Sequence, residues 1–207
     1  MLKVGVLVSG GGTNFQSIVD AIKSKKLTDT EIVTVVSSNP NAYALERAKK
    51  YDINAICIRK KDFETDILYQ KALIQHMKAK EVELIVMAGF MVVIGSLFIK
   101  EFEDKIINIH PSLIPSFCGN GYYGLKVHEA ALKKGVKITG ATVHFVTEET
   151  DAGPIIIQKP VVVLEDDTPE QLQKRVMEEA EWEILPSAIQ LFAHNRLKIV
   201  ENHVKIL

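Results

Sequence analysis

Short runs of apolar residues alternate with longer amphipathic stretches through the first half of the chain. Each run is nearly continuous in Val, Ile and Leu and indicates a buried strand, whereas the stretches between them repeat apolar residues with the helical period. The expected strands cover residues 4–9, 31–38, 55–59, 84–88 and 106–109, and the expected helices follow Asn14 and cover 42–51, 64–80 and 96–103. This alternation predicts an α/β fold with a Rossmann-like, doubly wound and mostly parallel sheet. Within the 64–80 helix, the spacing places Ile67, Leu73, Ile74 and Met77 on the buried face.

The pattern changes after Pro115. We expect a glycine-punctuated loop at 116–123, a helix at 124–134, strands at 139–146 and 154–164, and a long final helix at 168–195. Because the connection between the two strands is short, they should form an antiparallel hairpin. Pro186 should end or kink the final helix. The order fits one domain, residues 1–207, which can be divided into a Rossmann-like half at 1–105 and a second half at 106–207.

The first strand runs into Gly10-Gly11-Gly12-Thr13-Asn14, and a helix follows at once. Such a turn presents backbone N–H groups and the positive end of the helix dipole, which suits a phosphate, and glycine at 12 would let the phosphate approach the backbone. The dinucleotide fingerprint is not met, because Phe15 stands where its third glycine belongs and the second strand ends in Ser37-Ser38-Asn39 without an acid. A tight turn that binds nothing is the other interpretation.

Two polar residues, Asn108 and His110, interrupt the apolar strand that begins at Ile106. Side chains two apart on a strand point to the same face, and Pro111 ends the strand directly afterwards. The amide and the imidazole should therefore project together at the carboxyl end of a strand, where open α/β sheets bind ligands. A histidine in such a place is often only a hydrogen-bonded structural residue, so the rest of the chain must decide.

Asp151 lies in the connection between the two late strands. In one interpretation it is an ordinary turn aspartate, because glycine and proline follow it closely. In the other, the carboxylate folds over the strand end, stabilises the protonated form of His110 and fixes its orientation. With Asn108 the group then suits acyl transfer between two bound partners, because an amide and an imidazole can stabilise an oxyanion while the imidazole and the carboxylate move protons.

Composition narrows the function classes. The chain is 47% apolar and 25% charged, as in ordinary globular proteins, and its net charge of −1 gives no general attraction to nucleic acid or to a membrane. No apolar run has the length of a membrane span and the N-terminus lacks a signal-peptide layout, so we expect a cytoplasmic protein. The cysteines form neither a disulfide framework nor a zinc site; Cys57 should lie in the core, and Cys118 has no assigned chemistry.

Five motifs fall in order along the chain. They are Val-Ser-Gly-Gly-Gly-Thr-Asn at 8–14, Met-Ala-Gly-Phe-Met at 87–91, Asn-Ile-His-Pro-Ser-Leu-Ile-Pro at 108–115, Gly-Ala-Thr-Val-His-Phe-Val-Thr at 140–147 and Asp-Ala-Gly-Pro-Ile-Ile-Ile-Gln at 151–158. Together they closely resemble the folate-dependent phosphoribosylglycinamide formyltransferases of purine synthesis, a branch of the formyltransferase family. The Asn-x-His-Pro-Ser element with its distant Asp is shared by the 10-formyltetrahydrofolate enzymes of this fold, and the glycine loop is more particular to this branch.

The resemblance implies an enzyme that transfers the formyl group of 10-formyltetrahydrofolate, a co-substrate, to the amine of 5-phosphoribosylglycinamide by direct attack, without a metal. It implies that residues 1–105 form a phosphate-binding Rossmann half and residues 106–207 a catalytic and folate-binding half, in which Asn108, His110 and Asp151 are the catalytic set. The residues that it implies for the substrate are Gly12, Thr13, Asn14, Phe15, Gln16 and Glu181, and those for the folate are Met91, Val92, Val93, Ile94 and Asn108. Partners would be small molecules, with no nucleic acid or membrane, and the protein would be a monomer or homodimer.

The chain also departs from the family. Val92 and Asp66 stand where many relatives have basic residues, which weakens the expected contacts to the glutamate tail of the folate, and the spacing around Glu181 differs by one residue. His144 should support the site from a core strand, while His128 has no assigned role. The sharp turn after the strand end, and the frequent cis bond of relatives here, predict a cis Ile114–Pro115 bond.

Other readings of the resemblance remain. The family's formyltetrahydrofolate hydrolases carry an extra N-terminal regulatory domain and its methionyl-tRNA formyltransferases a C-terminal barrel, and neither is expected in 207 residues. A phosphate-sensing binding module of Rossmann type is the alternative from a different class, against which the presence of all three catalytic residues speaks.

Overall fold

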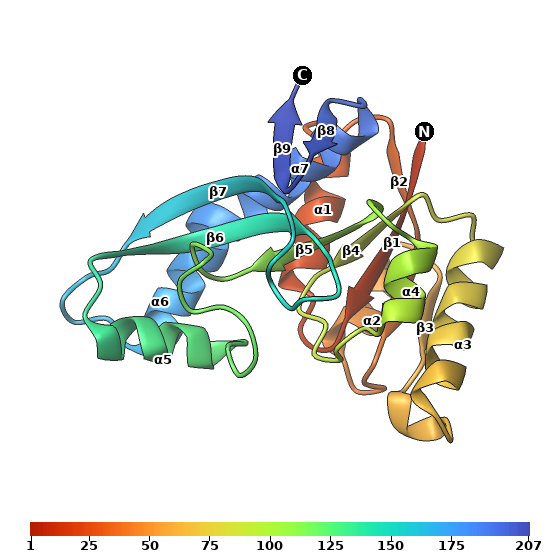
Figure 1. The fold of residues 1–207 in the computed structure, drawn as a ribbon, viewed down its shortest axis with the longest axis horizontal. Coiled ribbons are helices and arrows are strands. Elements are labelled where there is room, and N and C mark those ends of the chain that lie inside the picture. The colour runs from red at the N-terminus through yellow and green to blue at the C-terminus, as the bar shows by residue number, and fades with distance from the viewer. The chain divides into compact units, whose positions relative to one another are not determined.

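A computed structural model describes all residues, 1–207, and the chain divides into two compact units, Met1–Ile107 and Asn108–Leu207. Figure 1 shows the course of the chain through both units. The strands follow the order β3-β2-β1-β4-β5-β6-β7 in one sheet of seven. The predicted fold class, a mostly parallel doubly wound sheet with a late antiparallel hairpin, is confirmed.

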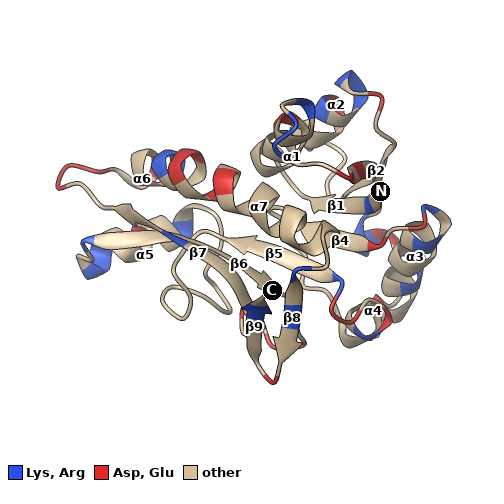
Figure 2. Cartoon of the chain, turned by 90° about the horizontal axis from the view of Figure 1, so that it is seen from above, with Lys and Arg blue, Asp and Glu red and all other residues tan.

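The first unit is built from four parallel strands and the helices that connect them. The strands are β1 (Leu2–Val8), β2 (Thr30–Ser37), β3 (Ala55–Cys57) and β4 (Leu84–Met87), and the helices are α1 (Thr13–Lys23), α2 (Tyr43–Lys50), α3 (Asp66–Ala79) and α4 (Ser96–Glu101), with a 3-10 turn at Lys60–Asp62. Helices α1 and α2 cover one face of these strands and α3 and α4 the other (Figures 1 and 2). Both faces of β1 are therefore buried, and Val4, Val6, Leu7 and Val8 have no exposed surface.

Strand β5 (Ile106–His110) begins at the end of the first unit and ends in the second. The second unit contains α5 (Leu125–Lys134), the antiparallel pair β6 (Ile138–Phe145) and β7 (Ile155–Val162), α6 (Pro169–Val176), a π-helical stretch (Met177–Glu181), α7 (Trp182–Ala193), and the strands β8 (Leu197–Val200) and β9 (His203–Ile206). Helix α7 and the π-helical stretch pack against β6 and β7. No helix of the structure has both the length and the apolar character needed to cross a bilayer.

The final helix differs from the prediction. It does not end at Pro186, which is buried inside α7, and its irregularity lies upstream in the π-helical stretch Met177–Glu181. A proline removes one i→i−4 hydrogen bond, and the helix tolerates this loss close to a stretch where the regular ladder is already interrupted. After α7 the chain forms the β8–β9 hairpin, which we did not expect.

Two predictions about burial were wrong. Ile67 is 57% exposed, because the buried face of α3 is formed by Tyr69, Gln70, Leu73 and Met77 and Ile67 lies in the first turn beside that face. Cys57 is exposed rather than in the core, because it is the last residue of β3, the edge strand of the sheet. Leu73 and Met77 lie inside, as expected.

Candidate active site

In the second unit, Asn108 and His110 lie at the carboxyl end of β5, two residues apart on the same strand. His110 Nδ1 lies 3.5 Å from Asp151 Oδ2, which is ion-pairing distance when the ring is protonated. The two side chains are only 5% and 10% exposed, so little solvent screens them. The predicted approach of Asp151 to His110 is confirmed.

Local backbone geometry brings Asp151 to the strand end. Asp151 has a φ of 56°, in the left-handed region that Asp tolerates better than most residues. Two residues later, a Cβ at Gly153 would lie 1.9 Å from the Phe145 carbonyl oxygen, so only glycine lets the connection close this tightly. The pairing of β6 with β7 shifts register between Val143 and His144, and such irregularities redirect side chains near functional sites.

The loop after β5 contacts both members of this pair. His110 Nε2 donates a hydrogen bond to the Phe117 carbonyl at 2.9 Å, and the Gly119 N–H donates to Asp151 Oδ2 at 2.9 Å. A carbonyl oxygen only accepts, so Nε2 of His110 carries a proton in this arrangement. The loop thus engages the one donor of His110 that does not face Asp151.

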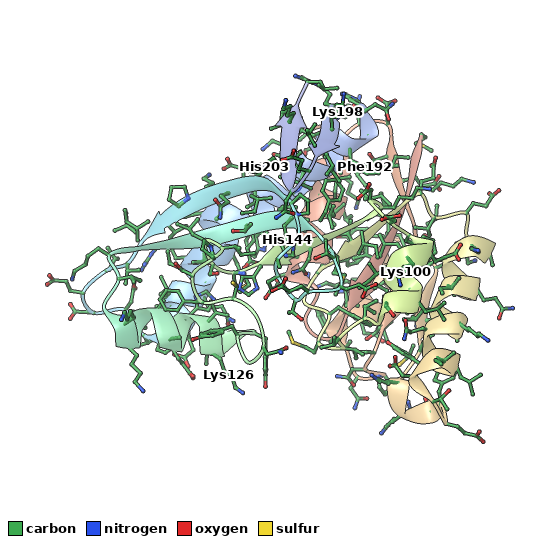
Figure 3. All side chains as sticks on the ribbon, in the orientation of Figure 1. Lys100, Lys126, His144, Phe192, Lys198 and His203 are labelled. Carbon is green, nitrogen blue, oxygen red and sulfur yellow. The ribbon has the colours of Figure 1, made fainter.

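His144, on β6, lies close to both Asn108 and Asp151 and is labelled in Figure 3. Its Nδ1 donates to the Phe145 carbonyl at 2.8 Å, and burial lowers the pKa of His144, so the ring is neutral. Its Nε2 is then an acceptor and lies 3.2 Å from Asn108 Nδ2 and 3.7 Å from Asp151 Oδ1. This assignment orients the Asn108 amide, with its nitrogen toward His144.

A cis peptide bond between Ile114 and Pro115, as predicted, forms the turn after β5. Two polar side chains of the β6–β7 pair hold this turn. Thr142 Oγ1 donates to the Ser112 carbonyl at 2.7 Å and accepts from the Ile114 N–H at 3.1 Å, and Gln158 Nε2 donates to the Ile114 carbonyl at 2.9 Å. The turn that carries the chain away from His110 is therefore fixed on both sides of the cis bond.

His128, on α5, is completely buried, and neither ring nitrogen has a protein hydrogen-bond partner. Burial, and then the nearby charge of His110, lower the pKa of His128 to about 4. The ring is therefore neutral at physiological pH. It forms part of the apolar surroundings of the site rather than of its hydrogen-bond network.

In the first unit, the glycine loop lies between β1 and α1. Gly12 is the N-cap of α1, without a side-chain hydrogen bond to the helix end, and the first turn contains no acidic residue. By contrast, α3 and α6 are capped by the hydroxyls of Thr65 and Thr168. A helix N-terminus without side-chain cap or acid suits an external anion.

Backbone conformation and packing give a further reason for glycine at position 12. Gly12 has a φ of 73°, and a Cβ there would lie 2.6 Å from the Cβ of Ala44 on α2. Backbone conformation and helix packing therefore require this glycine, whether or not a phosphate approaches it. A Cβ at Gly10 or at Gly11 would meet no atom within 4 Å.

Three other residues assigned to the substrate are partly or wholly enclosed. The Phe15 side chain is fully buried, so only its backbone could contact a ligand. Gln16 donates from Nε2 to Asp20 Oδ1 and to the Tyr51 hydroxyl, at 2.9 and 2.8 Å. Glu181, in the second unit, is 5% exposed at the end of the π-helical stretch.

The segment expected to bind the folate follows β4 in the first unit. Met91 and Val93 are 54% and 68% exposed, Val92 is half-buried and Ile94 is buried. The Met91 N–H donates to Ser9 Oγ at 2.8 Å, and Ser9 Oγ lies 2.6 Å from Ser38 Oγ. Exposed apolar side chains on a segment held at its start suit a flat aromatic ligand. No group of three or more His, Cys, Asp or Glu side chains has a metal-binding arrangement.

Sequence reasoning missed two residues at these sites. Ser9 joins the ends of β1 and β2 to the Met91 segment, whereas the sequence pattern predicts only the end of a strand there. Arg47 of α2 donates from Nε to the Gly11 carbonyl at 2.8 Å, and nothing in its helical sequence context indicates this contact. A serine at the carboxyl end of a central strand is a signal that could have been used.

The chain is similar to known proteins in sequence and in fold. The model of the formyl transferase family matches residues 2–189. A phosphoribosylglycinamide formyltransferase of Haemophilus influenzae is 37% identical over 202 residues, which are 98% of this chain and 92% of that protein. The crystal structure of glycinamide ribonucleotide transformylase 1 from Symbiobacterium toebii superposes with a TM-score of 0.94 at 40% identity, covering 100% of this chain and 94% of that one.

A longer relative is similar in one part. The trifunctional purine biosynthetic protein adenosine-3 of Gallus gallus is 41% identical over 200 residues, or 97% of this chain. The chain spans 19% of that protein's length, so the likeness concerns one part of it.

Proposed function

The chain belongs to the formyl transferase family, and from this premise we propose that it transfers the formyl group of 10-formyltetrahydrofolate to the amine of 5-phosphoribosylglycinamide in purine biosynthesis. Two proteins that match 98% and 100% of this chain are named a phosphoribosylglycinamide formyltransferase and a glycinamide ribonucleotide transformylase. The observation that carries the proposal is the cluster in the second unit, in which Asn108, His110 and Asp151 come together around His144.

The reaction is a direct acyl transfer. The amine nitrogen of the ribotide attacks the formyl carbon and forms a tetrahedral intermediate with a negatively charged oxygen. The carbon–nitrogen bond to the folate then breaks, the amine loses a proton, and the N10 nitrogen of the folate gains one. Neither step needs a covalent bond to the protein, which agrees with a site that has no nucleophilic side chain at its centre.

The side chains divide this work. The Asn108 amide and the protonated His110 ring donate hydrogen bonds to the developing oxyanion, and removing one such donor in other enzymes slows the reaction about 10²-fold to 10³-fold. Asp151 stabilises the protonated ring and accepts the proton that leaves the amine. His144 takes no proton, because burial keeps its ring neutral, and it orients Asn108.

One contact must change before His110 can act. Its Nε2–H is engaged by the Phe117 carbonyl, so this carbonyl has to leave the ring when Nε2 donates to the oxyanion. Phe117 has a φ of 50°, and the loop around it contains Gly119 and Gly121, also at positive φ. Glycines allow such a loop to rearrange at low cost.

Most of the residues that we assign to substrate positioning lie in the first unit. The loop Gly10–Asn14 at the N-terminus of α1 binds the phosphate of the ribotide, with Gly12, Thr13 and Asn14 as its centre and the backbone of Phe15 and Gln16 behind them. The segment Met91–Ile94 supplies apolar contacts for the pterin. Glu181 of the second unit contacts the ribose.

The test is formyl transfer with purified protein, 10-formyltetrahydrofolate and 5-phosphoribosylglycinamide. We expect formylated ribotide and tetrahydrofolate in equal amounts. Release of formate without the ribotide, at a rate equal to that with it, would assign the chain to hydrolysis instead. Phosphate binding without turnover of either kind would favour a sensing module with a degenerate site.

A further inference from the structure

Arg47, on α2, makes two hydrogen bonds with the glycine loop and the start of α1 and lies beside Gly12. Its Nε donates to the Gly11 carbonyl at 2.8 Å, and its Nη1 donates to Gln16 Oε1 at 3.0 Å. Its Cδ lies 3.5 Å from the place that a Cβ at Gly12 would occupy. One side chain thus spans the loop from Gly11 to the first turn of α1.

Helix α2 as a whole supports the loop from the same side. The Ala44 N–H donates to the Gly10 carbonyl at 3.2 Å, so the carbonyls of both Gly10 and Gly11 accept hydrogen bonds from α2. The Ala44 Cβ fills the space beside Gly12, as described above. Among these contacts only Arg47 adds a charge.

Arg47 has no carboxylate partner. Its contacts are the two hydrogen bonds above and the ring of Tyr43, whose centroid lies 5.1 Å from the guanidinium carbon. Nη2 donates to no protein group, and the side chain is half-buried. A half-buried guanidinium without a counter-ion, beside a helix N-terminus without an acid, creates a positive potential at the loop.

We propose that Arg47 is a positioning residue for the substrate: it holds the Gly10–Gly12 loop in the conformation that binds the phosphate monoester, and its charge adds to the attraction. This inference rests on the proposed function for the identity of the phosphate ligand. Figure 2 shows α2 with basic residues along it, and Arg47, Lys49 and Lys50 form its last turn. Of these three, only Arg47 contacts the loop.

Helix α2 supplies two variants of Arg47 and a control variant at Lys49. Arg47→Met keeps most of the length of the side chain and removes both donors and the charge, whereas Arg47→Lys keeps the charge but not the two-pronged geometry. Lys49→Met removes an equal charge from the same helix at an exposed position. Thermal unfolding of all three variants establishes that each is folded.

Steady-state kinetics with the ribotide and with its dephosphorylated riboside gives the first readout. We expect Arg47→Met to raise the KM for the ribotide roughly 10-fold to 100-fold, the range for a lost charge-assisted hydrogen bond. Its kcat, its KM for the folate and its kcat/KM for the riboside should stay within about twofold of wild type. Arg47→Lys should recover part of the loss, and Lys49→Met should behave as wild type. An unchanged ribotide KM in Arg47→Met, or an equal loss with both substrates, would overturn the inference.

A second readout does not depend on turnover. In wild type, titration with inorganic phosphate should shift the backbone amide NMR signals of Gly10, Gly11 and Gly12, and Arg47→Met should weaken this binding at least several-fold while Lys49→Met does not. If wild type forms no formylated product but shows this pattern, the proposed function fails and the role of Arg47 stands. If phosphate shifts none of these amides in wild type, the role of Arg47 is refuted whatever the enzyme turns over.

Discussion

The amide nitrogen of Asn108 lies 3.2 Å from Nε2 of His144, and the opposite ring nitrogen of His144 donates to the Phe145 carbonyl. A neutral imidazole held by a main-chain acceptor therefore decides which way the Asn108 amide points. An amide turned the other way would present its oxygen to the same ring nitrogen, and two acceptors would face each other.

This relationship predicts coupling between the two residues. His144→Phe keeps a ring in place but removes the acceptor, so kcat should fall roughly 10-fold or more, and Asn108→Ala should fall further, about 10²-fold to 10³-fold. In the double variant most of the loss from His144→Phe should disappear, because the amide that it orients is absent. The measurement is a double-mutant cycle on kcat, and fully additive losses would contradict the proposed role of His144.

Asp151→Asn should retain the fold and both ligands while kcat falls at least about 100-fold, the lower range for a lost general acid–base group. The amide oxygen can still accept the Gly119 N–H, so the loop contact survives, but the charge opposite His110 Nδ1 is lost. Calorimetric titration with the ribotide and with a folate analogue checks binding, and single-turnover kinetics checks the chemical step. A variant with nearly wild-type kcat would remove Asp151 from the mechanism.

An added side chain should affect stability very differently at the neighbouring positions Gly11 and Gly12. Gly12→Ala should lower the free energy of unfolding by about 2–4 kcal/mol, because it combines a left-handed backbone with overlap against Ala44. Loss of activity in a Gly12→Val variant would therefore report packing rather than phosphate binding. Gly11→Ala adds a Cβ in open space and should change stability by less than about 0.5 kcal/mol. Chemical denaturation of Gly12→Ala and Gly11→Ala measures both free energies of unfolding, and equal destabilisation of the two variants would contradict this prediction.

His128 predicts a loss of stability in acid. Its pKa is about 4 in the folded chain, whereas the ordinary pKa of histidine is about 6.5, so between these values the unfolded chain binds a proton that the folded chain does not. The unfolding free energy should therefore decrease as the pH falls from 6.5 to 4, by at most about 3 kcal/mol from this residue. His144, whose pKa burial also lowers, acts in the same direction.

His128→Leu should make the dependence of unfolding free energy on pH shallower in this range without destabilising the protein at pH 7, because no hydrogen bond of the ring is lost. Urea unfolding at a series of pH values measures the slope. His203→Leu, at an exposed position, is the control and should leave the slope unchanged. A slope that is the same in His128→Leu and in wild type would refute the assignment.

The parts of the fold that follow from local periodicity could be predicted from the sequence. Strands β1, β2 and β4 are apolar runs between helical patterns, and the closeness of Asp151 to His110 followed from chemistry at a strand end. The β8–β9 hairpin was missed although Leu197–Val200 and His203–Ile206 flank a two-residue connection, with Glu201 at a φ of 55°. The connection lacks the Asn-Gly or Asp-Gly signal of such turns, so the sequence pattern does not predict a hairpin after the final helix.

Contacts between distant residues could not be predicted. Arg47 meets Gly11 across 36 positions of sequence, and a basic residue on an amphipathic helix normally faces solvent. Gly12 likewise packs closely against Ala44 of α2, and the sequence rules for turns do not predict this contact. The exposure of Cys57 depends on β3 being the edge of the sheet, which an apolar run alone does not reveal.

The π-helical stretch Met177–Glu181 has a consequence for how this sequence can vary. One residue added to a regular α-helix rotates every later side chain by about 100° and would turn a buried face to solvent. A π turn takes up the extra residue locally, so Leu172 and Val176 before it and Ile184 and Leu185 after it are all buried. Deleting one residue between Met177 and Ala180 should produce a continuous α-helix with both buried faces intact, which makes this segment a place where insertions and deletions can be tolerated inside regular secondary structure.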